Sequence, residues 1–443
     1  MMYKFPEDLY SDVRIETITT TEIGLRNDRL YKNKTKTEIG AMIRMFDGER
    51  WYYNATTDIA NIQDAIDRLA EMTTPNKSVY ECPEIKILEV NQDRIIRYEK
   101  DDISKIDNLK KLELVRRYNG FTKVSDKIKA AYLFYNDERI IKHFMSSKGT
   151  DVEYDRQHVR AGLFYSVVDH GIPTESYKIL DGILFEDVAN REKEIEEEIQ
   201  KGLDYAEKAV PVTAGEYPCI LEPSVAGVFA HESFGHKSEA DFMMNDEAMR
   251  KEWTIGKTVG ASDLSIADGG EDEYHGYVPY DDEGSKSQTT YLIKNGVLSG
   301  RLHNSITAAC LAEDLTGDAR AIGFEYEPIV RMSNTYILNG TMTKEELFET
   351  VSEGVYVESW RHGSGLSTFT IAPVRAYMIR EGKIAEPVRV SFISGNVMDT
   401  LHLIDGISNR IEMSSGWCGK NEQNGLPVGQ GGPYIRVKKL SVQ

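Results

Sequence analysis

An acidic, helix-like segment at residues 185–209 divides this chain into two parts with different patterns. Its apolar residues recur at helical spacing and form one stripe: Val188, Ile199, Leu203 and Ala206. The run EKEIEEEIQK supplies charge to the other side, so we interpret the segment as a solvated connecting helix. Before it, strand and helix patterns are mixed, whereas after it glycine is frequent and short strands dominate. We therefore predict two domains, at residues 1–190 and 191–443.

The N-terminal part predicts an antiparallel sheet with helices. The first 55 residues alternate apolar and polar side chains and turn at DGER, which is typical of strands with one buried face. Residues 58–72 and 103–117 change to helical spacing. Residues 127–170 return to strands, among which we expect a turn at Asn136-Asp137.

The C-terminal part predicts hairpins and short helices. Asn295-Gly296 and Glu381-Gly382 each separate two strand-like runs, and such pairs favour tight hairpin turns. Residues 343–354 and 398–407 have the spacing of short helices. We therefore expect an α+β fold with a smaller N-terminal domain of sheet and helices and a larger C-terminal antiparallel-sheet domain.

Charge and cysteine content limit the function classes. The 443 residues carry a formal net charge of −19, which repels phosphate and argues against a general nucleic-acid binder. No apolar stretch approaches the ~18 residues of a membrane span, and the start MMYKFPEDLYSD lacks the apolar core of a signal peptide. The four cysteines lie far apart and do not suggest a disulfide framework. These features predict a cytoplasmic protein that does not bind membranes.

The main candidate site lies in the segment VAGVFAHESFGHKSEAD. Histidine is the commonest zinc ligand, and a glutamate such as Glu232 beside a ligand is the usual base of a hydrolytic metal site. His231 and His236 are five residues apart, whereas the zincin pattern H-E-x-x-H places its histidines four apart. On a regular helix the two rings would diverge. We therefore predict a widened i→i+5 turn across Ser233–His236, in which Gly235 relieves crowding.

Neighbouring residues favour a site over a helix with two unrelated histidines. Residues 225–230 are small and apolar, as in a buried helix, and a glutamate in such a run is costly to bury without a role. The C-terminal domain would therefore carry a metal-binding helix. Glu239 and Asp241 follow, and they could orient the ligand imidazoles or be simple exposed acids.

A catalytic zinc needs a third protein ligand. His275 and His362 lie in glycine-containing segments, and Cys418 lies between Gly416 and Gly419, where a thiolate could approach a metal. These three remain candidates. Packing or surface roles are expected for five other histidines: His143, His158, His170, His303 and His402. Core positions are expected for Cys219 and Cys310.

Other chemistries have weaker support in the sequence. It contains no G-x-S-x-G, no G-x-x-x-x-G-K-[ST] and no G-x-G-x-x-G pattern. Cys418 could instead be the nucleophile of a thiol hydrolase, although no histidine lies at a fixed spacing from it.

Four ordered segments resemble the TldD/PmbA family of metallopeptidases and span most of the chain. They are VAGVFAHESFGHKSEAD, the stretch TVGASDLSIADGGEDEYHGYVPYDDEG, IVRMSNTYILNG and WCGKNEQNGLPVGQGGPYIRV. TldD-like members keep the H-E-x-x-x-H motif that PmbA-like (TldE) members have lost, so this chain is similar to the catalytic kind. The resemblance implies zinc held by His231, His236 and Cys418, with Glu232 as general base.

The resemblance also implies a substrate and a partner. The substrate would be an unfolded protein or leader-type peptide, and the assembly would be a homodimer or a heterodimer with a PmbA-like (TldE) subunit. Many relatives have a G-G-x-V pattern where this chain has Arg361-His362-Gly363-Ser364-Gly365-Leu366-Ser367. The resemblance therefore does not establish how this chain handles its substrate. The alternative to a zinc metallopeptidase is a catalytically silent subunit or peptide-binding module of the same family.

Overall fold

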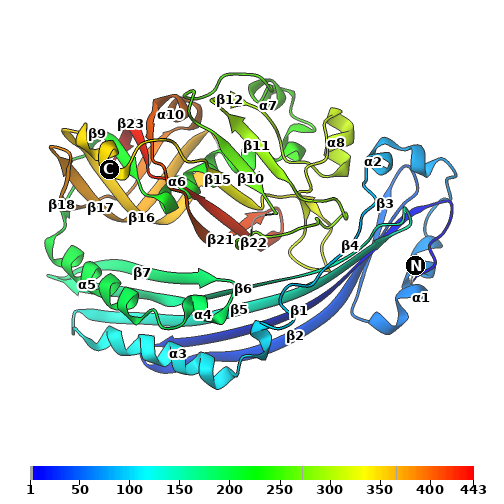
Figure 1. Cartoon of the computed structure of the whole chain (residues 1–443), viewed down its shortest axis with the longest axis horizontal. Helices are drawn as coiled ribbons and strands as arrows, with labels where there is room; N and C mark the ends of the chain where they lie inside the picture. The colour runs from blue at the N-terminus through cyan, green and yellow to red at the C-terminus, as the bar shows by residue number, and fades with distance from the viewer. Residues whose placement is uncertain (1–2, 272, 366) are drawn as a thin grey trace.

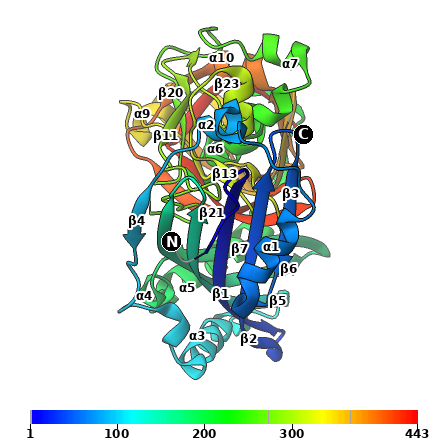
Figure 2. The same cartoon turned by 90° about the vertical axis from the view of Figure 1, so that its right-hand side faces the viewer.

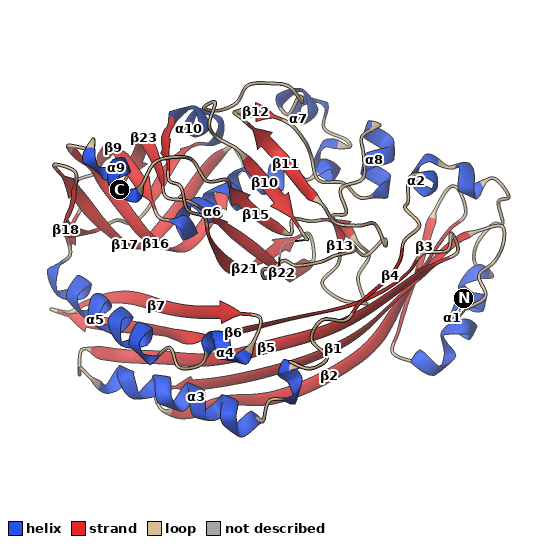
Figure 3. Ribbon diagram, viewed as in Figure 1, coloured by secondary structure: helices blue, strands red, loops and turns tan. Residues whose placement is uncertain are grey.

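A computed structural model describes residues 3–271, 273–365 and 367–443 of the chain. It is an α+β fold, as predicted, with a smaller N-terminal domain of sheet and helices and a larger C-terminal domain (Figure 1, Figure 3). The C-terminal domain lies over the concave face of a long, curved N-terminal sheet, which both views show (Figure 1, Figure 2).

Among the described residues, seven strands form the N-terminal sheet. Their order is β3-β2-β1-β5-β6-β4, with β7 also paired to β6, and every pair except β4–β6 is antiparallel. The strands are β1 (Tyr10–Arg26), β2 (Arg29–Phe46), β3 (Trp51–Thr56), β4 (Gln92–Ile95), β5 (Ile128–Ser146), β6 (Asp151–Asp169) and β7 (Ile172–Gly182). The predicted early strands are thus confirmed.

Helices cover the outer face of this sheet and lie at its ends. They are α1 (Ile62–Ala70), α2 (Pro83–Lys86), α3 (Asn108–Gly120), α4 (Phe185–Val188) and α5 (Glu192–Lys208). Helices α3 and α5 bury their apolar residues against β5 and β6 in one core cluster. The helices expected in residues 58–72 and 103–117 are confirmed as α1 and α3.

The turn expected at Asn136-Asp137 is wrong. Both residues lie inside β5, and the chain turns at residues 147–150 instead. The buried Asp137 carboxylate stays in the strand because the Lys111 ammonium of α3 lies 2.5 Å from it. A cation from a distant helix therefore offsets the cost of burying a turn-forming residue in a strand.

The interpretation of residues 185–209 as a solvated connecting helix is wrong in part. The segment breaks at Asn190, which adopts a left-handed φ of 57°, into α4 and α5. Glu198, within the acidic run, is buried and accepts two hydrogen bonds from Arg375 of the C-terminal domain, at 2.6 and 2.8 Å. Helix α5 therefore contacts both domains, and the boundary between residues 190 and 191 stays a prediction.

In the described part of the C-terminal domain, the strands form two larger sheets and one two-stranded ribbon. The order β16-β9-β23-β19-β17-β18-β8, with β20 beside β23, forms one sheet, and β12-β11-β10-β15-β22-β21 forms the other. Most pairs are antiparallel, but β9–β16, β15–β22 and β8–β18 are parallel. The predicted hairpin turns at Asn295-Gly296 and Glu381-Gly382 are confirmed, with left-handed φ at all four residues.

The elements of this domain have the following bounds. The strands are β8 (Val210–Pro211), β9 (Gly215–Leu221), β10 (Ile266–Gly269), β11 (Thr289–Lys294), β12 (Val297–Leu298), β13 (Ala319–Arg320), β14 (Ile329–Val330), β15 (Asn334–Ile337), β16 (Glu353–Gly365), β17 (Thr368–Arg380), β18 (Lys383–Arg389), β19 (Ile393–Asn396), β20 (Ile404–Ile407), β21 (Glu412–Lys420), β22 (Gln423–Gly432) and β23 (Ile435–Val442). The helices are α6 (Pro223–Ala230), α7 (Glu247–Glu252), α8 (Ser305–Leu311), α9 (Lys344–Glu349) and α10 (Val397–Leu403), so both predicted short helices are confirmed.

Buried ion pairs join the two domains at the loop that follows β10. Arg44 of β2 bonds Asp12 of β1 at 2.7 Å and reaches across to Glu283 at 3.1 Å. Lys142 of β5 lies 2.6 Å from Asp282 in the same loop. Burial raises the pKa of Asp282, but Arg14 and Lys142 outweigh burial and lower it to about 2. The acidic DDEG segment of the sequence is therefore the docking loop for the N-terminal sheet.

No helix in the described ranges combines the length and apolar character needed to cross a membrane. This agrees with the absence of a long apolar stretch in the sequence.

The ionic junction predicts a large loss of stability when its central cation is removed. Arg44→Met should lower the free energy of unfolding by about 3–5 kcal/mol, because Asp12 and Glu283 would stay buried without their partner. Urea unfolding measures this change. As a control, Lys36→Met removes the exposed ion pair with Glu38 and should cost less than about 1 kcal/mol. Equal losses in the two variants would contradict a structural role for the junction.

Candidate metal centre

The helix that carries the two histidines widens at the predicted place. Helix α6 ends at Ala230, and residues His231–Gly235 form a π-helical turn. The His236 amide donates to the His231 carbonyl, which is an i→i+5 hydrogen bond. Gly235 permits this turn to pack against the core, because a Cβ there would lie 2.0 Å from Met332 Sδ. The irregular helix predicted from the five-residue spacing is confirmed.

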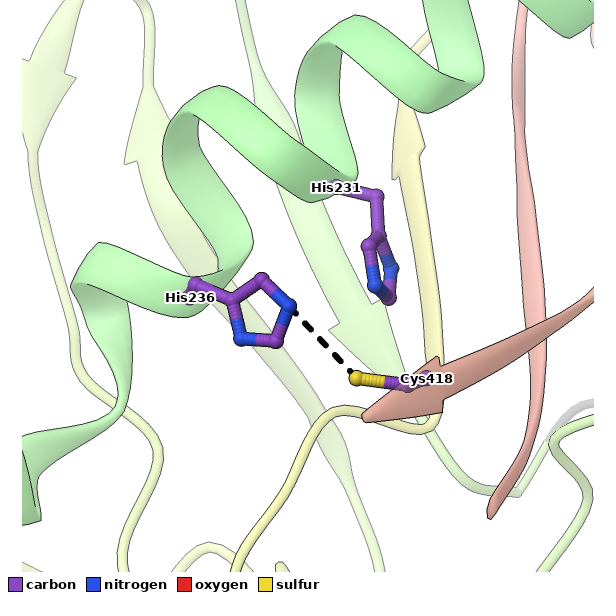
Figure 4. Close-up of side chains that lie close together, drawn as sticks. All are labelled: His231, His236 and Cys418. Carbon is purple, nitrogen blue, oxygen red and sulfur yellow. Dashed lines mark hydrogen bonds between the residues drawn. The ribbon is translucent and has the colours of Figure 1, made fainter. Parts of the chain in front are cut away.

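The widened turn presents both imidazoles to one strand of the second sheet. His231, His236 and Cys418 point toward one another, the first two from the helix and the third from β21 (Figure 4). Their ligand atoms all lie within 4.8 Å of one another, and Cys418 Sγ is 3.5 Å from His236 Nε2. Within the described ranges, this is the one group of three or more His, Cys, Asp or Glu side chains with such spacing.

The His236 ring is held by acids and a lysine behind it. Glu239, fully buried, lies 3.1 Å from His236 Nδ1, which leaves Nε2 facing the cysteine. Lys420 bridges Glu239 at 3.3 Å and Asp241 at 2.7 Å. Of the two acids that could orient imidazoles, Glu239 does so directly, whereas Asp241 pairs with Lys420.

Cys418 lies in a strand and not in the glycine-rich loop expected from the sequence. It belongs to β21, which forms a hairpin with β22 through a turn at Asn421. A register shift between Cys418 and Gly419 accompanies the glycine. Arg331, fully buried, donates to the Cys418 carbonyl at 3.0 Å and so fixes the strand at this point. The loop prediction failed because glycine is uncommon in strands, whereas the pairing of β21 with β22 holds this glycine-containing segment in a sheet.

Cys418 and His236 each have a shifted pKa. Burial raises the pKa of the Cys418 thiol, but the imidazoles of His231 and His236 outweigh burial and lower it to about 5. Burial lowers the pKa of His236, but Cys418 and Glu239 outweigh it and raise that pKa to about 10. Cys418 is therefore a thiolate near neutral pH, which is the form that binds metals.

The residues present fit a soft divalent cation such as zinc. Two imidazoles and one thiolate form a donor set that zinc accepts, with a fourth position left for water. The buried Nδ1 atom of His231 has no hydrogen-bond partner in the described part of the protein, which is expected of a metal ligand when no ion is bound. Glu239 supplies the outer carboxylate that fixes a ligand histidine.

Glu232 lies on the same turn and beside strand β16. It is half-buried, and its Cγ would be 3.5 Å from a Cβ on Gly363. A Cβ on Gly365 would lie 2.9 Å from the Glu232 carbonyl oxygen, so β16 can approach the helix this closely only with glycine there. The segment 361–367, in which the sequence departs from the family pattern, therefore contacts the helix directly. Leu366 lies outside the described residues.

The other candidate ligands lie elsewhere. His275 packs its ring against His158, with ring centroids 4.2 Å apart, and His362 is exposed on β16. Cys219 is buried, as expected, but Cys310 is exposed, so its predicted core position is wrong. Cys310 lies on α8, whose buried residues are Ser305, Thr307 and Ala308, and the apolar run around it therefore gave a misleading signal.

Two residues that support the centre were not identified from the sequence. Lys420 and Arg331 are buried cations that hold Glu239 and the Cys418 carbonyl. Both occur in segments that resemble the family, CGKNEQ and IVRMSN. A charged residue in an otherwise apolar or glycine-rich run was the sequence signal that could have indicated a buried, paired cation.

Comparisons with known proteins agree with this architecture. The profile of the PmbA/TldA metallopeptidase C-terminal domain matches residues 214–443, and that of PmbA/TldA metallopeptidase domain 1 matches residues 11–73. A metalloprotease of Synechocystis sp. is 32% identical, over 99% of this chain and 96% of its own length. A zinc metalloprotease TldD homolog of Saccharolobus solfataricus is 31% identical, over 98% of this chain and 96% of its own.

Solved structures share the fold at low sequence identity. A protein of Thermotoga maritima superposes with a TM-score of 0.78 at 18% identity, over 98% of this chain and 96% of its own. TldE from Thermococcus kodakarensis superposes with a TM-score of 0.75 at 16% identity, over the same shares of the two chains. At these identities the likeness concerns the fold alone.

The low pKa of Cys418 can be tested in metal-free protein. The ultraviolet absorbance of the thiolate, taken as wild type minus Cys418→Ser, should rise near pH 5 and not near the ordinary thiol value of 9.0. Because the pKa is lower in the folded state, ionisation of Cys418 stabilises the metal-free fold fully above pH 9, and this contribution is lost as the pH falls through about 5. A midpoint near 9 would contradict the contact with the imidazoles.

Proposed function

We propose that this chain, which belongs to the PmbA/TldD family of metallopeptidases, is a zinc-dependent peptidase that hydrolyses unfolded or leader-type peptides. The observation that carries the proposal is the convergence of His231, His236 and Cys418 on one point through the π-helical turn. The names of the metalloprotease relatives, one of them called a zinc metalloprotease, support the same reading.

His231, His236 and Cys418 would hold the zinc ion. When bound, zinc supplies a Lewis acid for the scissile carbonyl and lowers the pKa of water toward 7. Glu239, backed by Lys420, holds the His236 imidazole, and Arg331 holds the backbone of Cys418, so these two donors need little reorganisation to bind a cation.

Glu232 would act as general base and then as general acid. It adjoins His231 on the π-helical turn and does not belong to the group of three ligand atoms. It would accept a proton from the attacking water and deliver that proton to the leaving amine. Its half-buried position beside β16 limits the water around it, which favours proton transfer within the site.

The rival reading is a catalytically silent subunit or peptide-binding module. Such a subunit has no need for the donor residues, whereas this chain brings two histidines and the cysteine together and has a glutamate next to His231 in the sequence. A partner remains part of the proposal: a second copy of this chain, or a TldE-like subunit, to whose fold this chain is similar. We place the protein in the cytoplasm, where thiolate ligands stay reduced.

Glu232→Gln should retain zinc and lose peptidase activity. The change removes the carboxylate base while nearly conserving its shape, so we expect kcat for an unstructured peptide to fall by at least about 100-fold. Metal analysis and turnover of the purified variant measure both effects. Near-normal turnover with zinc bound would contradict the role of Glu232.

Cys418→Ser should release zinc, whereas Cys219→Ser and Cys310→Ser should not. A serine hydroxyl stays protonated and binds zinc poorly, and neither control cysteine lies in the group of three ligand atoms. Metal content and thermal stability of the three variants, measured in parallel, give the comparison. A zinc ion held by these residues would connect β21 with the helix, so its loss should lower the melting temperature of the Cys418 variant. Full zinc content in that variant would refute the ligand assignment.

A further inference from the structure

A polar cavity lies between the domains, at the beginning of the helix that carries the metal centre. Its volume is about 350 Å³. Glu222, Ser359, Ser415 and Gln430 line it from the C-terminal domain, and Tyr177 and Lys201 line it from the N-terminal domain. Neither the proposed zinc ligands nor Glu232 belongs to its wall.

Most charges in the wall of this cavity are already paired. Arg375 contacts Glu198 at 2.6 Å and Glu358 at 2.7 Å, and Lys201 contacts Glu358 at 2.6 Å. Two acids differ, because in the described ranges no cationic group lies within salt-bridge distance of Asp181 or Glu222. Asp181 accepts a hydrogen bond from the Ser415 amide at 2.9 Å, and Glu222 accepts one from the Ser224 hydroxyl at 2.6 Å. Burial raises the pKa of Glu222 to about 8, so without a cation beside it this group is mainly the neutral acid at pH 7.

Neutral acceptors in the same cavity also lack partners. Ser359 is 7% exposed, and its Oγ has no hydrogen-bond partner among the described residues. The Oγ of Ser415 is likewise unpartnered there. Burying a hydroxyl without a partner costs free energy, so such groups commonly mark a place where water or a ligand binds. The amide of Gln430, 4% exposed, completes this wall.

We propose that this cavity binds an ammonium group of the peptide substrate. The Glu222 carboxylate would be the counter-charge, and the hydroxyls of Ser359 and Ser415 would accept the remaining hydrogen bonds. An ammonium group fits because it carries three donors and one positive charge, which would favour the ionised form of Glu222 and satisfy the neutral acceptors around it. This inference rests on the proposed peptidase function and extends it to the recognition of the substrate.

The position of the cavity sets its distance from the metal centre. Glu222 precedes His231 by nine helical residues, which corresponds to about 13 Å along the axis. Ser415 precedes Cys418 by three strand residues, or about 10 Å. An extended peptide covers such a distance with roughly three or four residues. The ammonium group would therefore belong to a residue a few positions from the cleaved bond, either as the free amino terminus or as a lysine side chain.

The test measures peptide binding without cleavage. Zinc-loaded Glu232→Gln protein is titrated by calorimetry with three alanine-based hexapeptides: one with a free amino terminus, one acetylated, and one acetylated with a single lysine. We expect the peptide with the favoured ammonium to bind roughly 10- to 100-fold more tightly than the acetylated peptide without lysine. Preference for the first peptide identifies the amino terminus, and preference for the third identifies a lysine side chain.

A matched pair of variants assigns the preference to the cavity. Adding Glu222→Gln should abolish it, whereas adding Glu196→Gln, on the exposed side of α5, should leave it intact. If the Glu222 variant does not fold, Ser359→Ala should reduce the preference by roughly 3- to 10-fold. Equal binding of the three peptides, no binding of any, or a preference that survives Glu222→Gln would overturn the proposal.

The outcome is separable from that of the proposed function. Peptide cleavage by the wild-type protein without any preference for an ammonium group overturns the cavity assignment alone. An ammonium preference that Glu222→Gln abolishes, in a protein without peptidase activity, supports the cavity and refutes the proposed function.

Discussion

The hydrogen bond from the His236 amide to the His231 carbonyl is the constraint on which the candidate centre depends. It inserts one residue into a helical turn, and without it the two imidazoles would diverge around the helix. The same turn requires Gly235 against Met332 and places Glu232 beside strand β16. A backbone irregularity in one short helix therefore determines the positions of both histidines and of the adjacent carboxylate.

The rest of the protein holds other elements against that turn. Strand β21 brings Cys418 to the histidines, and Arg331 holds its carbonyl. The N-terminal sheet contributes from the other side, because the Arg160 guanidinium of β6 lies 3.8 Å from the ring centroid of Trp417, the neighbour of Cys418. The ion pairs at the DDEG loop fix the sheet in this position. The domain junction thus affects the centre even though it supplies none of the three donor side chains.

Local patterns in the sequence were sufficient for features that depend on local spacing. The five-residue interval predicted the widened turn, and Asn295-Gly296 predicted a hairpin, because sequence neighbours determine both. Two of the errors concern residues whose partners are distant: Asp137 stays in a strand because of Lys111, and Glu198 is buried because of Arg375. Cys418 is a different case, because its partner strand β22 follows directly and the glycines of the segment concealed a hairpin. No periodicity in one segment reports on a counter-charge or a strand that folds against it later.

The order of the three donors along the chain has a consequence for biosynthesis. Cys418 follows His236 by 418 − 236 = 182 residues. At about 5–20 residues per second, a ribosome needs roughly 10 to 35 seconds to add them. During that interval the histidines exist without the thiolate, and the polypeptide cannot assemble the centre. A peptidase of the kind proposed above would therefore stay inert while it is nascent, when its own unfolded segments are most exposed to cleavage.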